Sequence, residues 1–209
     1  MRLVLASNNA KKLAELQALF APLSLQLVTQ GTLGIPEAEE PHVTFVENAL
    51  AKARHAAQWA DGPALADDSG LCVDALGGAP GVISAHFAGL VAPDPDRETQ
   101  RDAQDQANNR LLIERMSGVS ARRARFVSTL IAVRSAHDPE PLIAMGRWEG
   151  EILHAPVGQG GFGYDPLMFI PALGQAAAEL APAVKNAHSH RALASRQMVA
   201  LIREVWRLD

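Results

Sequence analysis

The order of strand-like and helix-like segments constrains the fold of this chain more than any other feature. Residues 2–6 form an apolar run typical of a buried strand, and residues 7–9 supply Ser and Asn side chains that favour the start of a helix. A second strand near residues 25–28 continues this alternation. Further along, residues 122–133 and 142–152 have the pattern of two long strands joined as a hairpin. Crossover helices early and antiparallel strands late predict an α/β fold with a mixed sheet.

Helices are predicted where apolar or small residues recur every three or four positions. One begins near Thr44, which offers an N-cap with Glu47 at the spacing of a capping box. Another develops after Asp96, and the last helix closes the chain. The residues expected on the buried faces are Leu13, Leu16, Leu19 and Phe20, then Ala49, Ala53, Ala56, Ala57 and Ala60, then Leu111, Leu112 and Met116, and finally Met198, Leu201, Ile202, Val205 and Trp206.

Length and charge are those of an ordinary globular protein. The 209 residues predict one domain, 1–209, that can bury a substantial core, and the net charge of −4 argues against binding to long nucleic acid. The apolar runs are too short for a membrane span, and the first strand is too short for a signal peptide. The single cysteine, Cys72, is expected in the buried core of a cytoplasmic protein and is a poor candidate for a catalytic thiol.

Two adjacent carboxylates are the most informative pair of side chains in the sequence. Strands are expected over residues 64–66 and 71–74, with a turn at Ser69 that leaves Asp67 and Asp68 at a strand end. Burying two carboxylates is costly unless cations or hydrogen bonds compensate for the lost water. A metal ion is the simplest such partner, and an ordinary polar turn is the alternative.

A second metal carboxylate is available upstream of these aspartates. Glu37, Glu39 and Glu40 lie in an acidic connection before the Thr44 helix, and Glu47 lies in its first turn. Magnesium prefers one or two carboxylates together with waters and phosphate oxygens, so one of these glutamates is a natural second ligand. Ordinary compensation of the helix dipole is the alternative interpretation.

The junction between the first strand and the first helix has the chemistry of a phosphate site. The start of a helix offers backbone amides and partial positive charge, and Lys12 adds a full charge. The chain has no Gly-x-x-x-x-Gly-Lys-Ser/Thr sequence, so this is not a Walker A loop. A plain N-cap with solvated lysines is the alternative. The junction residues are Ser7, Asn8, Asn9, Ala10, Lys11 and Lys12.

Two later segments indicate a flat, anionic ligand. In the glycine-rich loop, Phe162 is expected to stack on a ring and Asp165 to accept hydrogen bonds from a ring N–H, although a tight hairpin with core aromatics has the same sequence pattern. Lys185, His190 and Arg191 place cations at the expected start of the last helix, where an anion is favoured. Alternatively, Ser189 and His188 are a simple cap and an exposed side chain. The histidines lack the further ligands that a zinc site needs.

Six segments, in this order, resemble the inosine/xanthosine triphosphate pyrophosphatase family, also called Ham1-like, over nearly the whole chain. They are Ser7-x-Asn9-x-x-Lys12, Phe45–Ala49, Ala66–Leu71, Gly77–Gly81, Gly161–Pro166 and Ser189–Arg191. The resemblance implies a homodimer of two-lobed α/β subunits, each with a long twisted mixed sheet flanked by helices and a nucleotide cleft between the lobes. It also implies Mg²⁺-dependent hydrolysis of the deaminated purine nucleoside triphosphates ITP, dITP and XTP to the monophosphate and pyrophosphate.

The resemblance further implies a role for each matching residue. Asp68 would be the catalytic base and a metal ligand, and Glu40 is favoured as the second metal carboxylate, with Glu37, Glu39 and Glu47 as alternatives. Residues 7–12 would cradle the triphosphate. The other substrate-binding residues would be Ser69, Phe162, Gly163, Tyr164, Asp165, Lys185, His190 and Arg191. One stretch, residues 181–184, departs from the family pattern because it lacks the acidic residues expected before Lys185.

Two other functions are compatible with parts of this pattern. The first is a pyrophosphatase for pyrimidine or methylated nucleotides, against which the loop at residues 161–166 and the Ser189–Arg191 segment argue. The second is a nucleotide-binding sensor without catalysis, which the intact Asp67-Asp68 pair disfavours.

Overall fold

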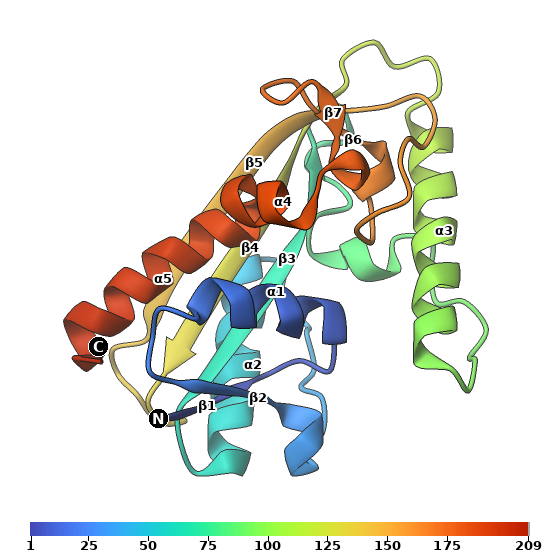
Figure 1. Ribbon diagram of the computed structural model, residues 1–209. Coiled ribbons are helices and arrows are strands. Elements are labelled where there is room, and N and C mark those ends of the chain that lie inside the picture. The colour runs from blue at the N-terminus through green and yellow to red at the C-terminus, as the bar shows by residue number, and fades with distance from the viewer. Residues whose placement is uncertain (209) are drawn as a thin grey trace. The chain divides into compact units, whose positions relative to one another are not determined.

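The computed structural model describes residues 1–208 as a mixed α/β protein (Figure 1). Seven strands form one sheet in the order β2-β1-β3-β4-β5-β6-β7. They are β1 (Arg2–Leu5), β2 (Gln26–Thr29), β3 (Ala64–Val73), β4 (Arg123–Val133), β5 (Leu142–Ile152), β6 (Met168–Ile170) and β7 (Gln175–Ala176). β1 pairs in parallel with β2 and β3, whereas β6 is antiparallel to β5 and β7. The predicted α/β fold with a mixed sheet is therefore confirmed.

Five α-helices accompany the sheet in the described residues. They are α1 (Ala10–Phe20), α2 (Phe45–Ala60), α3 (Arg97–Arg115), α4 (Pro182–His188) and α5 (His190–Trp206). α1, α2, α3 and α5 each begin after a side chain that accepts a hydrogen bond from a first-turn amide, which fixes the helix start; these caps are Asn9, Thr44, Asp96 and Ser189. Within residues 1–208, no helix is long and apolar enough to cross a membrane.

The described chain packs into two compact units. Unit 1 comprises residues 1–69, 128–147 and 186–208, and unit 2 comprises residues 70–127 and 148–185. The three long strands β3, β4 and β5 contribute residues to both units. Each unit has a hydrophobic core made from its own residues.

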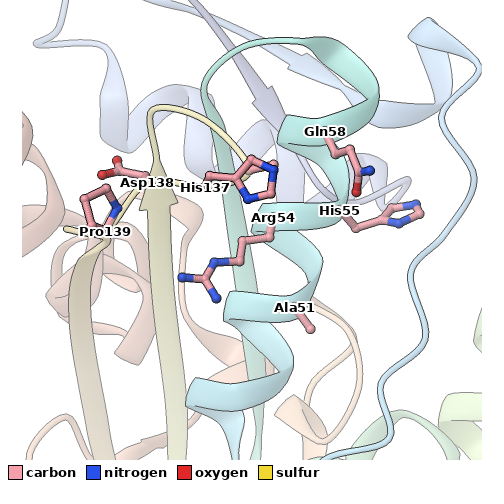
Figure 2. Close-up of a pocket in the computed structure, with 8 residues that line it drawn as sticks. Ala51, Arg54, His55, Gln58, His137, Asp138 and Pro139 are labelled. Atoms are coloured by element: carbon pink, nitrogen blue, oxygen red, sulfur yellow. The ribbon is translucent and has the colours of Figure 1, made fainter.

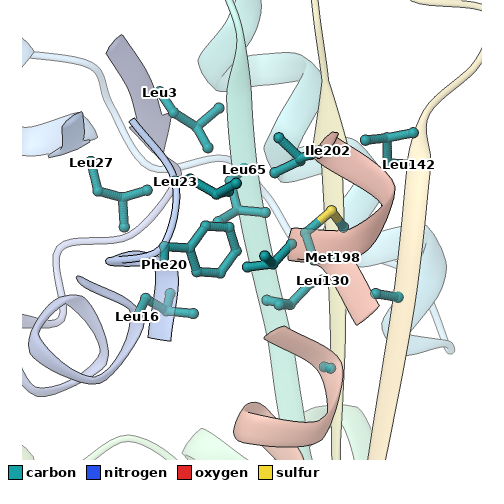
Figure 3. Packing of buried hydrophobic residues seen from close by; sticks show 14 of the residues in the cluster. Leu3, Leu16, Phe20, Leu23, Leu27, Leu65, Leu130, Leu142, Met198 and Ile202 are labelled. Atoms are coloured by element: carbon teal, nitrogen blue, oxygen red, sulfur yellow. The ribbon is translucent and has the colours of Figure 1, made fainter. Parts of the chain in front are cut away.

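Unit 1 has a core on each face of the sheet, because successive strand residues point to opposite faces. Figure 3 shows the first core, where Leu16 and Phe20 of α1 and Met198 of α5 meet leucines of the strands. The strand leucines of this core include Leu3, Leu5, Leu65 and Leu130. The second core joins Val4, Ala6, Ala64, Ala66, Ile131 and Val133 to Ala49, Ala53, Ala56 and Ala57 of α2. The predicted small face of α2 is thus confirmed as its buried face.

Unit 2 is built around α3 and the far ends of the long strands. Leu112 and Met116 of α3 pack with Phe126, Trp148 and other buried residues of this unit. Cys72 was expected in the core, but its side chain is only half-buried. It lies on β3 between Leu71 and Val73, whose side chains take the buried positions.

β3 is one continuous strand, so the predicted break after the two aspartates is wrong. Asp67 and Asp68 lie in the middle of the strand, and Ser69-Gly70 makes no turn. Gly70 is required for a different reason: a Cβ there would lie 2.5 Å from both the Gly81 carbonyl oxygen and the Ser84 Oγ. The glycine therefore permits a close approach of backbone and side chain to an extended strand.

Candidate functional site

The two adjacent aspartates point to opposite faces of β3. Asp67 follows Leu65 on the face covered by α1 and α5, and Asp68 follows Ala66 on the face covered by α2. The sequence indicated a shared polar end of a strand. The structure instead gives each carboxylate its own set of neighbours.

Asp67 is fully buried and surrounded by donors. Its Oδ2 lies 3.1 Å from Lys12 Nζ and 3.1 Å from Arg191 Nη2, and its Oδ1 accepts a hydrogen bond of 2.8 Å from the Ser128 hydroxyl. Burial alone would raise the pKa of Asp67, but the charges of Lys12 and Arg191 and the Ser128 bond hold this pKa far below its usual value. Asp67 is therefore a permanent carboxylate that anchors two cations.

Asp68 has a contrasting environment. Lys52 Nζ donates to its Oδ1 at 2.7 Å and also to Glu40 Oε2 at 3.1 Å. The second oxygen, Asp68 Oδ2, is buried and has no hydrogen-bond partner among the described residues. Burial raises the pKa of Asp68 to about 6, although the charge of Lys52 opposes this shift. Asp68 therefore combines a free oxygen with a pKa suited to accepting a proton near neutral pH.

Lys52 belongs to the site and was missed by the sequence analysis. Burial lowers the pKa of Lys52, but the charges of Asp68 and Glu40 more than offset this effect and raise it. The sequence did contain a signal, because Lys52 lies three residues after Ala49 and four before Ala56 on the buried alanine face of α2. A lysine on a buried helix face requires an anionic partner.

Among the four candidate glutamates, Glu40 is the one that shares Lys52 with Asp68. Glu37 accepts a hydrogen bond of 2.9 Å from Asn8 Nδ2, and Glu47 accepts one of 2.6 Å from the Thr44 hydroxyl. These contacts favour Glu40 as the partner of Asp68 in holding a cation.

The donor set fits magnesium better than a transition metal. Within residues 1–208, no group of three His, Cys, Asp or Glu side chains is placed to hold a metal ion. Magnesium does not need such a group, because waters and phosphate oxygens complete its octahedral shell around one or two carboxylates. The buried, unpartnered Oδ2 of Asp68 and the half-exposed carboxylate of Glu40 provide that minimal set.

The predicted phosphate-binding junction is located between β1 and α1. Asn9 caps α1 by accepting a hydrogen bond of 3.1 Å from the Lys12 amide, and Ser7 Oγ accepts one of 3.2 Å from the Asn9 amide. Burial lowers the pKa of Lys12, partly offset by the charge of Asp67. The junction therefore brings a helix start and a half-buried lysine together beside β3.

Arg191 is held in place by carboxylates of unit 1. Its guanidinium donates to Asp67 Oδ2 through two nitrogens, to Ser69 Oγ at 3.1 Å, and to Glu15 of α1. Glu15 is not among the predicted site residues. These contacts support a role for Arg191 in fixing Asp67 and Ser69.

The cationic group expected at the start of the last helix is divided between two helices. Lys185 lies in α4, whereas His190 and Arg191 are the first residues of α5. The two helices are separate because the backbone of Ser189 is extended. Ser189 caps α5 by accepting a hydrogen bond from the Ala192 amide. The alternative interpretation of Ser189 as a cap and of His188 as an exposed side chain is confirmed.

In unit 2 the glycine-rich loop is organised around Asp165. Its Oδ2 accepts hydrogen bonds of 2.9 Å from the Phe162 amide and 2.6 Å from Lys185 Nζ. Lys185 Nζ also lies 4.6 Å from the centre of the Phe162 ring. Tyr164 is buried, and its hydroxyl donates to the Ser84 carbonyl oxygen at 2.8 Å. Phe162 is half-exposed beside the Lys185 cation.

A surface hollow of about 530 Å³ lies elsewhere in unit 1 (Figure 2). It is bordered by Arg54, His55 and Gln58 of α2 and by residues 136–139, which follow β4. In Figure 2 the side chains of Arg54 and His137 extend into the space between α2 and this turn, whereas His55 points away. None of the predicted site residues lines this hollow.

Comparison with known proteins gives consistent matches along the whole chain. Residues 3–201 match the sequence model of the Ham1 family. The chain is 68% identical to the dITP/XTP pyrophosphatase of Methylibium petroleiphilum over 206 residues, covering 99% of both proteins. It is 65% identical to that of Leptothrix cholodnii, covering both completely. Among solved structures, a HAM1 protein from Coxiella burnetii has a TM-score of 0.87 at 42% identity, covering 98% of this chain and 100% of that one.

Proposed function

This chain belongs to the Ham1 family, and we propose that it is a nucleoside-triphosphate pyrophosphatase that hydrolyses dITP, XTP and ITP to the monophosphate and pyrophosphate. The first two substrates are those in the names of its relatives from Methylibium petroleiphilum and Leptothrix cholodnii. ITP carries the same base as dITP, so it presents the same recognition edge. In this role the protein removes deaminated purine nucleotides from the nucleotide pool.

The observation that carries this proposal is the contrast between the surroundings of the two aspartates, since Asp67 is bound by cations and a hydroxyl whereas Asp68 Oδ2 is buried without a partner among the described residues. Asp67 is fixed as an anion by Lys12 and Arg191, whereas the pKa of Asp68 is raised to about 6 by burial. Pairs of titratable groups whose environments push their pKa values apart are typical of acid–base sites. Hydrolysis of a phosphoanhydride needs one such base close to the attacking water.

In the proposed reaction, water attacks the α-phosphorus while its proton passes to the Asp68 carboxylate. A new P–O bond forms to the water oxygen, the bond from the α-phosphorus to the bridging oxygen breaks, and pyrophosphate leaves with that oxygen. Lys12 and the amides at the start of α1 neutralise negative charge on the triphosphate. Lys52 keeps the Asp68 carboxylate oriented through its bond to Oδ1.

Asp68 and Glu40 would hold Mg²⁺, which when bound supplies neutralisation of phosphate charge and geometric order. Ser69 follows Asp68 on β3, but its hydroxyl lies on the Asp67 face, where it donates to Asp67 Oδ2 at 3.2 Å and accepts from Arg191. The family resemblance assigns Ser69 to substrate contact.

Base recognition is assigned to the loop around Phe162. Hypoxanthine and xanthine present a keto oxygen at C6 beside an N1–H donor, and adenine presents the reverse arrangement. The Lys185 side chain is a suitable donor to the keto oxygen, the family resemblance adds His190 as a further donor, and the Phe162 ring is assigned to stacking. A site that leaves a buried donor unpaired rejects adenine by on the order of 10⁴-fold in kcat/KM, whereas guanine has the same keto edge and is not rejected by these donors. The homodimer and the cytoplasmic location stay predictions from the family resemblance.

A nucleotide panel tests the proposed function. Pyrophosphate release is measured for ITP, dITP, XTP, ATP, GTP, CTP and UTP, each with Mg²⁺ and with chelator. Fast release from the first three nucleotides that stops with chelator is expected. Equal rates across the panel would leave a hydrolase without the assigned base recognition. No release from any nucleotide, together with measurable nucleotide binding, would favour a sensor that lacks catalysis.

A further inference from the structure

The loop assigned to base recognition is gripped by a pair of polar residues on α3 that lie outside the motifs. Asp105 Oδ2 accepts a hydrogen bond of 2.6 Å from the Gly163 amide, and Asn109 Nδ2 donates one of 2.9 Å to the Gly163 carbonyl oxygen. We infer that Asp105 and Asn109 are positioning residues that fix the backbone of Gly163 and thereby set the discrimination between bases. This inference rests on the proposed function and deepens it.

The geometry of α3 explains how two side chains reach a single loop residue. Asp105 and Asn109 are four positions apart on a helix, so they lie one turn apart on the same face. One presents an acceptor and the other a donor, which matches the two hydrogen-bonding groups of one residue. Gly163 has a φ of +63°, a conformation that L side chains rarely adopt, so its peptide groups are turned in a direction that few residues permit.

The loop is then held at three consecutive points in unit 2. Gly163 is bound by α3, Tyr164 by its hydroxyl bond to the Ser84 carbonyl oxygen, and Asp165 by Lys185. Phe162 immediately precedes these points, and its own amide donates to Asp165. The direction of the Phe162 ring therefore depends on the backbone that Asp105 and Asn109 hold, although neither residue belongs to the loop.

Asp105 contributes a negative charge to the loop as well as a hydrogen bond. A hydrogen bond from an amide to a carboxylate is about twice as strong as one between neutral groups. Burial raises the pKa of Tyr164, and the negative charge of Asp105 adds to this shift, which indicates that the carboxylate acts on the loop beyond the single bond. Neighbouring polar residues on α3 bind elsewhere, since Gln104 and Asn108 are buried and bond to the backbone at Ser84, Ala88 and Gly89.

The experiment compares Asp105→Ala, Asp105→Asn and Asn109→Ala with the full-length wild type. The ratio of kcat/KM for ITP to that for ATP is measured, together with hydrogen exchange of the Gly163 amide by NMR. Asp105→Ala is expected to speed that exchange at least about tenfold and to lower the ratio about 5- to 20-fold, and Asn109→Ala to lower the ratio about 3- to 5-fold. Asp105→Asn keeps an acceptor oxygen and is expected to restore most of both properties.

Gln106→Ala is the matched control, because Gln106 is exposed on α3 between the two positioning residues. This substitution should leave both the hydrogen exchange of the Gly163 amide and the ITP-to-ATP ratio of kcat/KM unchanged. Unchanged Gly163 exchange in Asp105→Ala would overturn the inference. So would faster exchange with a wild-type ratio, or an equal loss of rate with both nucleotides accompanied by a lower melting temperature. A wild type that does not prefer ITP over ATP would instead overturn the proposed function, and the exchange data would still report whether α3 holds the loop.

Discussion

Neighbouring aspartates in a strand interior have become chemically different groups through their surroundings. Asp67 contacts Lys12, Arg191 and Ser128, while Asp68 contacts Lys52 and keeps one oxygen without a partner among the described residues. The contrast arises from strand geometry, since consecutive side chains face different helices. Their replacement is therefore expected to have different consequences.

Asp68→Asn is expected to abolish turnover while leaving nucleotide binding measurable and the free energy of unfolding within about 1 kcal/mol of wild type. The amide cannot take the proton of the attacking water, yet it fits the same space. Asp67→Asn is the matched comparison, and should cost about 3 to 5 kcal/mol because it leaves the buried Arg191 and the half-buried Lys12 beside a neutral group. Pyrophosphate release and denaturant unfolding measure both effects. Full activity in Asp68→Asn would contradict its assignment as the base.

The contact of α5 with β5 depends on the absence of a side chain at Gly146. A Cβ at this position would meet the His190 carbonyl oxygen and would lie 2.7 Å from the Ala194 amide nitrogen. Both neighbours are backbone atoms, so no rotation of a side chain relieves the clash. The start of α5, which carries Arg191, is therefore seated directly on the strand.

Gly146→Ala is expected to destabilise the protein by about 2 to 4 kcal/mol and to lower activity, because α5 must move away and carry Arg191 with it. Thermal unfolding and the rate of ITP hydrolysis measure this. Gly62→Ala is the control, since a Cβ there would meet its nearest neighbour, the Ala60 carbonyl oxygen, at an ordinary 3.7 Å. Equal melting temperatures for the two variants would refute the packing argument.

The sequence predicted most elements because their signals are local. Asn9, Thr44 and Asp96 are residue types that favour helix caps, and the two long strands alternate plainly. The prediction of a break in β3 was wrong. Ser69-Gly70 has the composition of a turn, but the glycine is needed for close contact with Gly81, eleven residues later in the chain. Burial by a partner far along the chain is not a local signal.

The candidate site was also predicted in part, with its motif residues identified and their contact partners not. The motif residues could be named from the family resemblance, but Lys52, Glu15 and Asp105 belong to none of the quoted motifs. In the structure each contacts a motif residue: Asp68, Arg191 and Gly163 respectively. Lys52 had a sequence signal in its place on the buried alanine face of α2, whereas Glu15 and Asp105 lie on helices whose packing is set by the whole core, so spacing in the sequence does not reveal their partners.

For the molecule as a whole, acid stability is expected to depend on the turn between β4 and β5. The Asp138 side chain is almost fully buried there and accepts hydrogen bonds from the Arg134 backbone amide at 2.8 Å and from its guanidinium at 2.9 and 3.0 Å. The bond to the Arg134 side chain is the main cause that lowers the pKa of Asp138 to about 2. A lowered pKa means that the folded state favours the ionised form more than the unfolded state does.

The stabilisation from Asp138 is therefore expected to be complete above about pH 4 and to disappear as the pH falls to about 2. Asp138→Asn should cost about 2 kcal/mol of unfolding free energy at pH 7, and this difference from wild type should shrink across that window. Urea unfolding at several pH values measures it. Glu140→Gln, at a largely exposed partner of Arg134, should change stability by less than about 0.5 kcal/mol. A difference for Asp138→Asn that stays constant from pH 7 to pH 2 would contradict this account.

Because side chains alternate along β3, the face that each aspartate occupies depends on whether its position in the strand is odd or even. The register Val4↔Ala64 and Leu5↔Leu65 ties β3 to β1, and the count of residues from there decides which aspartate faces α2. A single deletion between Leu65 and Asp67 would exchange the faces, sending the second carboxylate toward Lys12 and Arg191. Such a chain would retain both acidic residues and every motif letter after them, yet would present a serine where Asp68 now stands. The length of this strand segment is thus under as strict a constraint as the identity of its side chains.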